Sequence, residues 1–232
     1  GTHRWVVGGS YSVYNGDHFG EVIWARYSGS RDKDDRYYAN DSRKTDANAY
    51  GKLTYALTPR IDLFGDVQVR NVTHDFLGYD GDLRNVTQSV AFTFFNPKVG
   101  LSWKVDEHHR VYGSAAIANR EPNRDDLTET SPESRPTSER MLDIELGFER
   151  RAARMVAGVN AYYMDYRDQL VLTGELNDVG YALRTNVPGS YRAGVELTWA
   201  AQLTRSLTWR ANATVSLPVF TSGKITAGIR AA

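Results

Sequence analysis

Residues able to hold an anionic solute gather in one stretch, Asn119-Arg120-Glu121-Pro122-Asn123-Arg124-Asp125-Asp126. Guanidinium forks match carboxylates and similar planar anions through paired hydrogen bonds, so the two arginines are the strongest candidates. The candidate solute-contact residues are Arg120, Asn123, Arg124 and Asp125. A simpler interpretation, to which we give more weight, is that ion pairs anchor this stretch to a neighbouring strand.

Other polar clusters fit solvated loops and turns better than metal sites. The acids of Asp32-Lys33-Asp34-Asp35 and Asp80-Gly81-Asp82 could offer oxygens to Ca²⁺, but their spacing matches no EF-hand loop. The pair His108-His109 has no further ligands nearby in the sequence, so we interpret it as a polar turn. We therefore predict no metal site and no cofactor.

Composition excludes several classes of protein. Cysteine is absent, so a thiol nucleophile, a metal-thiolate site and a disulfide scaffold are excluded. Lys and Arg number 28 and Asp and Glu number 28, which gives no electrostatic case for a nucleic-acid partner. No Ser-His-Asp order and no Gly-rich phosphate loop stands out. We predict that the chain is not an enzyme and has no catalytic residue.

The elements that must position these residues are strands, because apolar residues recur at every second position. In Ile61 to Asn71 the odd positions are apolar or Gly up to Val69, and the even positions carry charged residues, Gln and one Phe. Leu142 to Glu149 repeats the pattern with the apolar residues at even positions. Successive side chains of a strand point to opposite faces, so each segment has an apolar face and a polar face.

The alternation predicts about ten strands, several of them far longer than the usual five or six residues. The expected ranges are 3–14, 18–28, 47–57, 61–76, 90–105, 110–119, 138–149, 154–173, 182–203 and 207–217. Tight turns are expected at 15–17, 58–60, 106–109, 150–153 and 204–206, and longer polar loops at 29–46, 77–89, 119–138 and 175–181. Short turns and long loops thus alternate, which places the turns at one end of the sheet and the loops at the other.

Two kinds of all-β protein have such strands. In a soluble sandwich the apolar face packs a core, whereas in a membrane barrel it meets lipid and the polar face lines the lumen. Long strands, alternating turn lengths and aromatic residues near strand ends favour the membrane barrel. No apolar run of about 18 residues is present, so no transmembrane helix is predicted.

Several motifs resemble the C-terminal half of TonB-dependent outer-membrane receptors. They are NAYYMDYRDQLVLTGELNDVG (160–180), RTNVPGSYRAGVELTW (184–199), FFNPKVGLSWKV (94–105) and VYGSAAIANREPNRDDL (111–127). They occur in the expected order over roughly Phe94 to Ser216, and their sequences are most similar to those of Bacteroidetes-type receptors. The first ninety residues fit by pattern alone.

The resemblance implies an antiparallel transmembrane β-barrel of about 22 strands, with short periplasmic turns and long extracellular loops, in the bacterial outer membrane. Residues 1–232 would be part of that barrel, without the plug domain and its TonB-contacting segment. Such receptors import a scarce large solute, here an iron chelate (siderophore or heme) or cobalamin. The implied partners are TonB acting through the plug, outer-membrane lipid and the solute, with a surface lipoprotein as a further candidate. In this setting Arg120 and Arg124 would hold carboxylates or catecholates of a ferric chelate.

The resemblance also explains the polar residues of Asp165 to Gln169 in a long apolar segment. Asp165 shares the parity expected to face lipid, where a charge is costly at the bilayer midplane. We therefore expect Asp165 to Gln169 at or beyond the outer interface.

Two alternative functions remain open. One is a passive porin-like or structural outer-membrane barrel, which would lack a plug. The other is a soluble β-rich carbohydrate-binding module, which would be a folded monomer without detergent.

Overall fold

A computed structural model describes residues 3–27, 32–128, 130, 135–176 and 182–220. Within these ranges the chain forms nine strands and one short helix. They are β1 (Arg4–Glu21), β2 (Arg36–Ala56), β3 (Ile61–Gly78), β4 (Gln88–Lys104), β5 (His109–Arg120), α1 (Arg124–Thr128), β6 (Glu139–Ala152), β7 (Met155–Leu176), β8 (Ala182–Gln202) and β9 (Thr208–Phe220). No helix in these ranges is long and apolar enough to cross a membrane.

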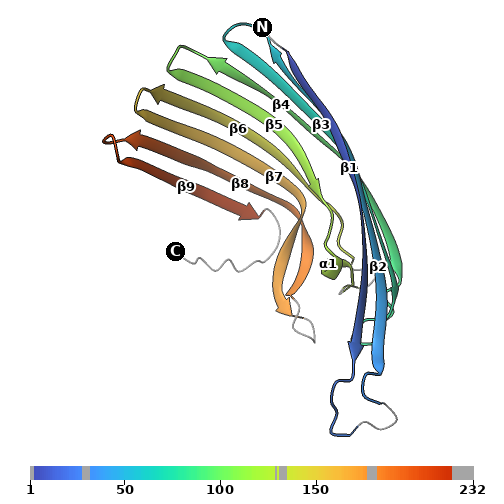
Figure 1. Cartoon of the computed structure of the whole chain (residues 1–232). Coiled ribbons are helices and arrows are strands. Elements are labelled where there is room, and N and C mark those ends of the chain that lie inside the picture. Colours follow the sequence, from blue (N-terminus) through green and yellow to red (C-terminus); the bar gives the residue numbers. More distant parts are fainter. Residues whose placement is uncertain (1–2, 28–31, 129, 131–134, 177–181, 221–232) are drawn as a thin grey trace. The chain divides into compact units, whose positions relative to one another are not determined.

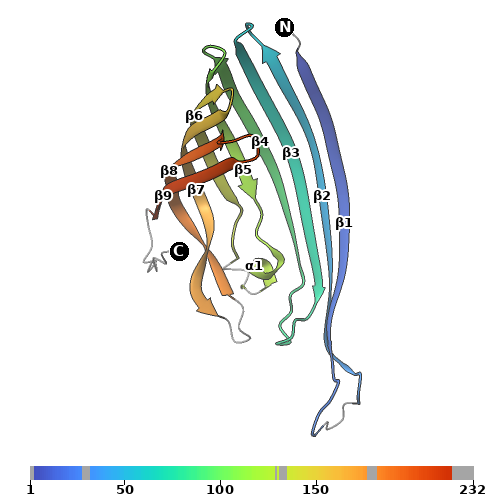
Figure 2. The same ribbon diagram turned by 60° about the vertical axis from the view of Figure 1, so that its left-hand side comes forward.

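The strands form one sheet in chain order, β1-β2-β3-β4-β5-β6-β7-β8-β9 (Figure 1). The strand pairs from β4 to β9 are antiparallel throughout. Figure 2 shows the same neighbours side by side from a second direction. The expected all-β, antiparallel class with long strands is confirmed, with nine described strands where about ten were expected.

Two expected boundaries are wrong at the N-terminal side. The turn predicted at Asn15-Gly16-Asp17 lies inside β1, which joins two predicted strands into one. The loop predicted at 29–46 is strand from Arg36 onward. A further strand suggested by the alternation at 225–230 lies outside the described residues.

The chain divides into two compact units. Unit 1 comprises residues 1–7, 50–68 and 95–232, and unit 2 comprises residues 8–49 and 69–94. In unit 1 the short turns after β2, β4, β6 and β8 lie at one end of the strands, and α1 lies at the other (Figure 1).

Cross-strand registers in unit 1 sort side chains into two faces. The apolar face contains three aligned rows from β4 to β9. The rows are Trp103-Val111-Phe148-Val159-Leu197-Ala213, Leu101-Gly113-Leu146-Ala161-Val195-Val215 and Val99-Ala115-Ile144-Tyr163-Ala193-Leu217. Most of their large side chains are exposed, as Leu146 at 62% and Val215 at 70% illustrate. An apolar surface this extensive requires a cover that the described chain itself does not supply.

The polar face of unit 1 carries aromatic rings laid over glycines of the next strand. Tyr112 lies opposite Gly147, and Tyr162 lies opposite Gly194. A Cβ on either glycine would meet the ring of that tyrosine. Because these residues are glycines, each tyrosine ring can pack directly against the backbone of the neighbouring strand.

In unit 2 the apolar residues change face. On β3, Val69 is exposed at an odd position, whereas Val72 and Phe76 are buried at even positions. The even face here also holds Ser42 Oγ, which lies 2.8 Å from His74 Nε2. The odd face is polar, with Asn71 Nδ2 donating to Thr93 Oγ1 at 2.9 Å. An outward surface that turns polar along one strand indicates that its surroundings turn from apolar to aqueous near Val69.

Candidate solute-contact site

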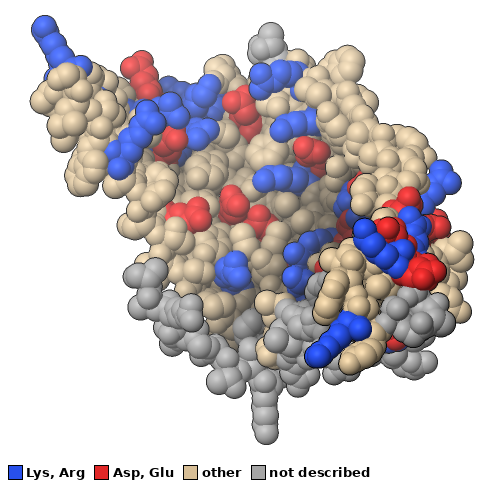
Figure 3. Space-filling view, turned by 60° about the horizontal axis from the view of Figure 1, so that its bottom comes forward, with Lys and Arg blue, Asp and Glu red and all other residues tan. Residues whose placement is uncertain are grey.

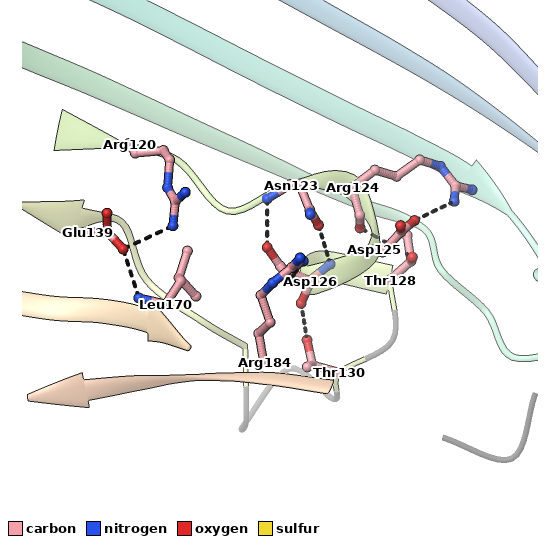
Figure 4. A network of polar contacts seen from close by, with 10 residues as sticks. All are labelled: Arg120, Asn123, Arg124, Asp125, Asp126, Thr128, Thr130, Glu139, Leu170 and Arg184. Carbon is pink, nitrogen blue, oxygen red and sulfur yellow. Dashed lines mark hydrogen bonds and ion pairs between the residues drawn. The ribbon is translucent and has the colours of Figure 1, made fainter. Parts of the chain in front are cut away.

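The connection between β5 and β6 contains α1, which is held by reciprocal caps (Figure 4). Asn123 Oδ1 accepts a hydrogen bond from Asp126 N at 2.8 Å, and Asp126 Oδ2 accepts one from Asn123 N at 2.9 Å. This is a capping box that satisfies donors at the start of a five-residue helix. Pro122 and Leu127 are almost fully buried, so residues 122–127 of the connection are well packed.

An ion pair between a buried carboxylate and a partly exposed arginine joins this connection to β8. Arg184 Nη1 lies 3.0 Å from Asp126 Oδ1, and the Asp126 side chain is 4% exposed. A buried carboxylate requires a partner because its desolvation cost is otherwise uncompensated. Figure 4 shows Arg184 reaching from its strand to Asp126. The pair fixes residues far apart in the sequence to one another.

The predicted residues lie on this connection but have different surroundings. Arg120 Nη2 lies 3.0 Å from Glu139 Oε2 at the paired ends of β5 and β6, and the same Glu139 oxygen accepts Leu170 N at 2.9 Å. The Arg120 side chain is 60% exposed, so part of its five-donor fork faces solvent. This arrangement combines both interpretations, because the guanidinium anchors a strand end and still presents donors outward.

Arg124 and Asp125 form a looser pair, with Arg124 Nη1 3.7 Å from Asp125 Oδ1. Asp125 is 55% exposed, whereas Asn123 has its amide oxygen engaged in the cap. The structure thus places all four predicted residues on one connection but uses Asn123 for local order. Sequence reasoning included Asp126 in this stretch without singling it out, and it missed Glu139 and Arg184. A capping-box pattern and the ends of β5 and β6 could have indicated these residues.

A second polar region lies on the polar face of unit 1 toward the turn end. It surrounds a hollow of about 560 Å³ lined mainly by charged residues. The charged lining residues are Arg4, Lys52, Asp62, Asp66, Lys98 and Arg110. Both signs are present, and Figure 3 likewise shows Lys and Arg interspersed with Asp and Glu. The alternation placed Asp62, Asp66 and Lys98 on the polar face, but it carried no signal that they would line a hollow.

The turn Asp106 to His109 is stabilised by one carboxylate. Asp106 Oδ1 accepts His108 N at 2.7 Å and His109 N at 2.8 Å, and Asp106 Oδ2 lies 2.8 Å from His109 Nδ1. The His109 side-chain hydrogen bond, followed by the His108 backbone bond, lowers the pKa of Asp106 to about 2. Over the described ranges no group of three or more His, Asp or Glu residues could hold a metal ion.

Comparisons with known proteins agree with this architecture. A family model described as "TonB dependent receptor-like, beta-barrel" matches residues 1–229. No curated protein matches the chain. Among solved structures, the copper transporter OprC superposes with a TM-score of 0.75 at 15% identity, over 93% of this chain and 35% of that one.

Two iron-related structures are also similar in fold. The ferric-catecholate import receptor Fiu from E. coli K12 has a TM-score of 0.72 at 14% identity, over 96% of this chain and 36% of that one. The FrpB iron transporter from Neisseria meningitidis (F5-1 variant) has a TM-score of 0.60 at 22% identity, over 79% and 28%. The chain therefore spans about a third of the length of these solved relatives.

Proposed function

Because the chain belongs to the TonB-dependent receptor β-barrel family, whose barrels lie in the outer membrane of Gram-negative bacteria, we propose that it forms part of the barrel of an energised importer. The family consists of transporters and receptors, so the chain is not an enzyme. The apolar face meets lipid in this proposal, and the polar face lines the lumen. A plug domain outside residues 1–232 would receive energy from TonB.

The observation that carries the proposal is the pair of opposite faces on long, aligned strands. Lipid can cover the exposed apolar rows, and water can solvate the charged opposite face. Strands of 17 to 22 residues in β3, β4, β7 and β8 exceed the span of about 9–11 residues that a bilayer needs, which leaves length for an extracellular part.

The proposed solute is an iron chelate, with heme or cobalamin as the alternatives. Arg120 and Arg124 lie at the loop end of unit 1 and carry cationic forks suited to carboxylates or catecholates. The charged hollow at the turn end would be a later contact on the same polar face. Solved relatives named for ferric catecholate, iron and copper support a metal-linked solute without selecting one.

Uptake by whole cells tests the proposal. A strain lacking the native gene would be supplied with single sources of ⁵⁵Fe-siderophore, heme or cobalamin, with and without the restored gene. We expect restored uptake of one source that disappears when tonB is deleted. Restored uptake that persists without TonB would identify a passive pore instead, and a folded native protein in the soluble fraction would support a soluble module.

A further inference from the structure

The apolar face of unit 1 ends in two arginines on neighbouring strands. Beyond the rows of the apolar face, the register gives Ile117-Leu142-Asp165-Tyr191 and then Asn119-Arg140-Arg167-Gly189. Arg140 and Arg167 are directly opposite each other and both are exposed. The two cations therefore lie side by side on the same face as the apolar rows, just beyond them toward the end of unit 1 that carries α1.

Two like charges directly opposite on one face repel each other, since their Cβ atoms are about 5 Å apart. Neither arginine forms an ion pair or hydrogen bond with another residue in the part of the chain that the structure describes. Asp165 is the nearest acid on this face, opposite Leu142, yet it makes no ion pair with either arginine. An external anion would relieve this repulsion.

The neighbouring residues suit the head group of a lipid. Tyr163 and Tyr191 stack just below the arginines on the same face, with ring centroids 5.7 Å apart. Tyrosines with an apolar body and a polar tip are enriched at the membrane interface. Gly189 lies opposite Arg167 and has no side chain.

We propose that Arg140 and Arg167 form a binding site for the phosphate of an outer-leaflet lipid. Each guanidinium can bind a phosphate through two parallel hydrogen bonds, and two adjacent forks can share one dianionic group. The tyrosine stack would lie against the upper acyl region. The inference rests on the outer-membrane location of the barrel but not on which solute it imports or on TonB.

The test uses the purified full-length receptor and bisphosphorylated lipid A, with dephosphorylated lipid A and inorganic phosphate as comparison probes. The variant Arg140→Gln/Arg167→Gln removes both cations. The matched control, Arg150→Gln/Arg154→Gln, removes two exposed arginines at the opposite, turn end of the same strand pair. Heat-modifiable gel mobility verifies that each variant is folded, and native mass spectrometry measures lipid occupancy.

We expect the Arg140/Arg167 variant to bind bisphosphorylated lipid A at least about tenfold more weakly than wild type, with the control unchanged. Dephosphorylated lipid A should bind wild type and variant alike. Equal binding of the phosphorylated lipid to wild type and variant would overturn the proposal. Competition by inorganic phosphate at the concentration of the lipid would also overturn it, because it would identify a site for free anions. Loss of tonB-dependent uptake with lipid binding intact would bear on the proposed function alone.

Discussion

At the scale of single residues, contacts rather than residue type decide which charges are available to a solute. Asp126 is a buried carboxylate paired with Arg184, whereas Arg120 is anchored by Glu139 and remains 60% exposed. The sequence offered both as members of one acidic and basic stretch. Arg120 is therefore the strongest solute-contact candidate of the four predicted residues, and Asn123 the weakest because its oxygen caps α1.

Replacing Arg184 tests whether its ion pair with Asp126 stabilises the contact between β8 and α1. Arg184→Met leaves the Asp126 carboxylate buried without its partner, which costs about 1–3 kcal/mol for a typical buried group. Because Arg184 is one-third exposed and solvent screens the pair, we expect a loss of stability in the lower half of that range. Hydrogen–deuterium exchange should increase at residues 123–128. Arg192→Met on the same strand serves as the control. Equal exchange in both variants would contradict a stabilising role for the Arg184–Asp126 ion pair.

The Asp106 turn predicts an acid-dependent loss of stability. Its carboxyl pKa is lowered to about 2, so the folded state binds this proton less readily than the unfolded chain, where the pKa is about 3.9. The stabilisation is therefore complete above about pH 4 and lost as the pH falls through about 2. Thermal unfolding of wild type and Asp106→Asn should differ at pH 5 and converge towards pH 2. A difference that stays constant over this range would refute the assignment.

At the scale of elements, the strands of unit 1 were predictable and those of unit 2 were less so. From β3 to β9 the period-two pattern gave the strands within a few residues, because apolar residues recur at every second position over most of each strand. The beginning of β2 reads as a loop since both of its faces are polar. Its polar groups are satisfied by β3, as when Arg70 Nη2 lies 2.6 Å from Asp46 Oδ2. Such partners cannot be identified from one strand alone.

The turn predicted at Asn15-Gly16-Asp17 failed for a related reason. Asn-Gly is a strong hairpin signal when two short strands flank it. Here β1 continues for 18 residues. A Cβ at Gly9 would meet the Asn48 backbone and a Cβ at Gly20 would meet the Tyr37 ring, so β2 lies beside β1 on both sides of the expected turn. Pairing with one long neighbouring strand therefore overrode the local turn preference.

Glycines under aromatic rings provide a test of the polar face. A Cβ at Gly194 would lie 2.5 Å from the Val215 carbonyl oxygen and would also meet the Tyr162 ring, whereas a Cβ at Gly65 would meet nothing within 4 Å. Gly194→Ala should therefore destabilise the folded barrel by about 1–3 kcal/mol. Gly65→Ala should not, although both remove the same backbone freedom. Urea titration of barrels folded into liposomes compares the two, and equal midpoints would disprove the packing argument.

The two faces differ most sharply in their tolerance of charge. Val215 and Thr214 are adjacent on β9 and similar in shape, but they lie on the apolar and polar faces opposite Val195 and Glu196. Val215→Arg should cost about 2–4 kcal/mol if it lies near the bilayer midplane. Thr214→Arg gains Glu196 as a partner and should fold almost normally. Folding yield in liposomes measures the difference; similar yields would mean that the faces are wrongly assigned.

At the scale of the whole molecule, the motifs identified the family but not the extent of the match. They covered roughly Phe94 to Ser216, whereas the family model extends over residues 1–229. The N-terminal strands have the alternating pattern of the barrel but none of the family's sequence motifs, so only the alternation predicted them. Three assignments stay predictions: the similarity to Bacteroidetes-type receptors, the domain assignment of residues 1–232 and the imported solute. The solute in particular is not readable, because motifs in a barrel wall depend on strand geometry more than on the solute.

The central claim is that alternate side chains of these strands meet lipid and water. The chain contains no cysteine, so single cysteines can be introduced along β7 at residues 158–163 without background from residues 1–232. Each would be spin-labelled in the full-length receptor in liposomes, and collisions with lipid-soluble oxygen and a water-soluble nickel chelate would be measured. We predict high oxygen accessibility at 159, 161 and 163 and high nickel accessibility at 158, 160 and 162. Accessibility without this two-residue period, or with the two sets reversed, would contradict the account.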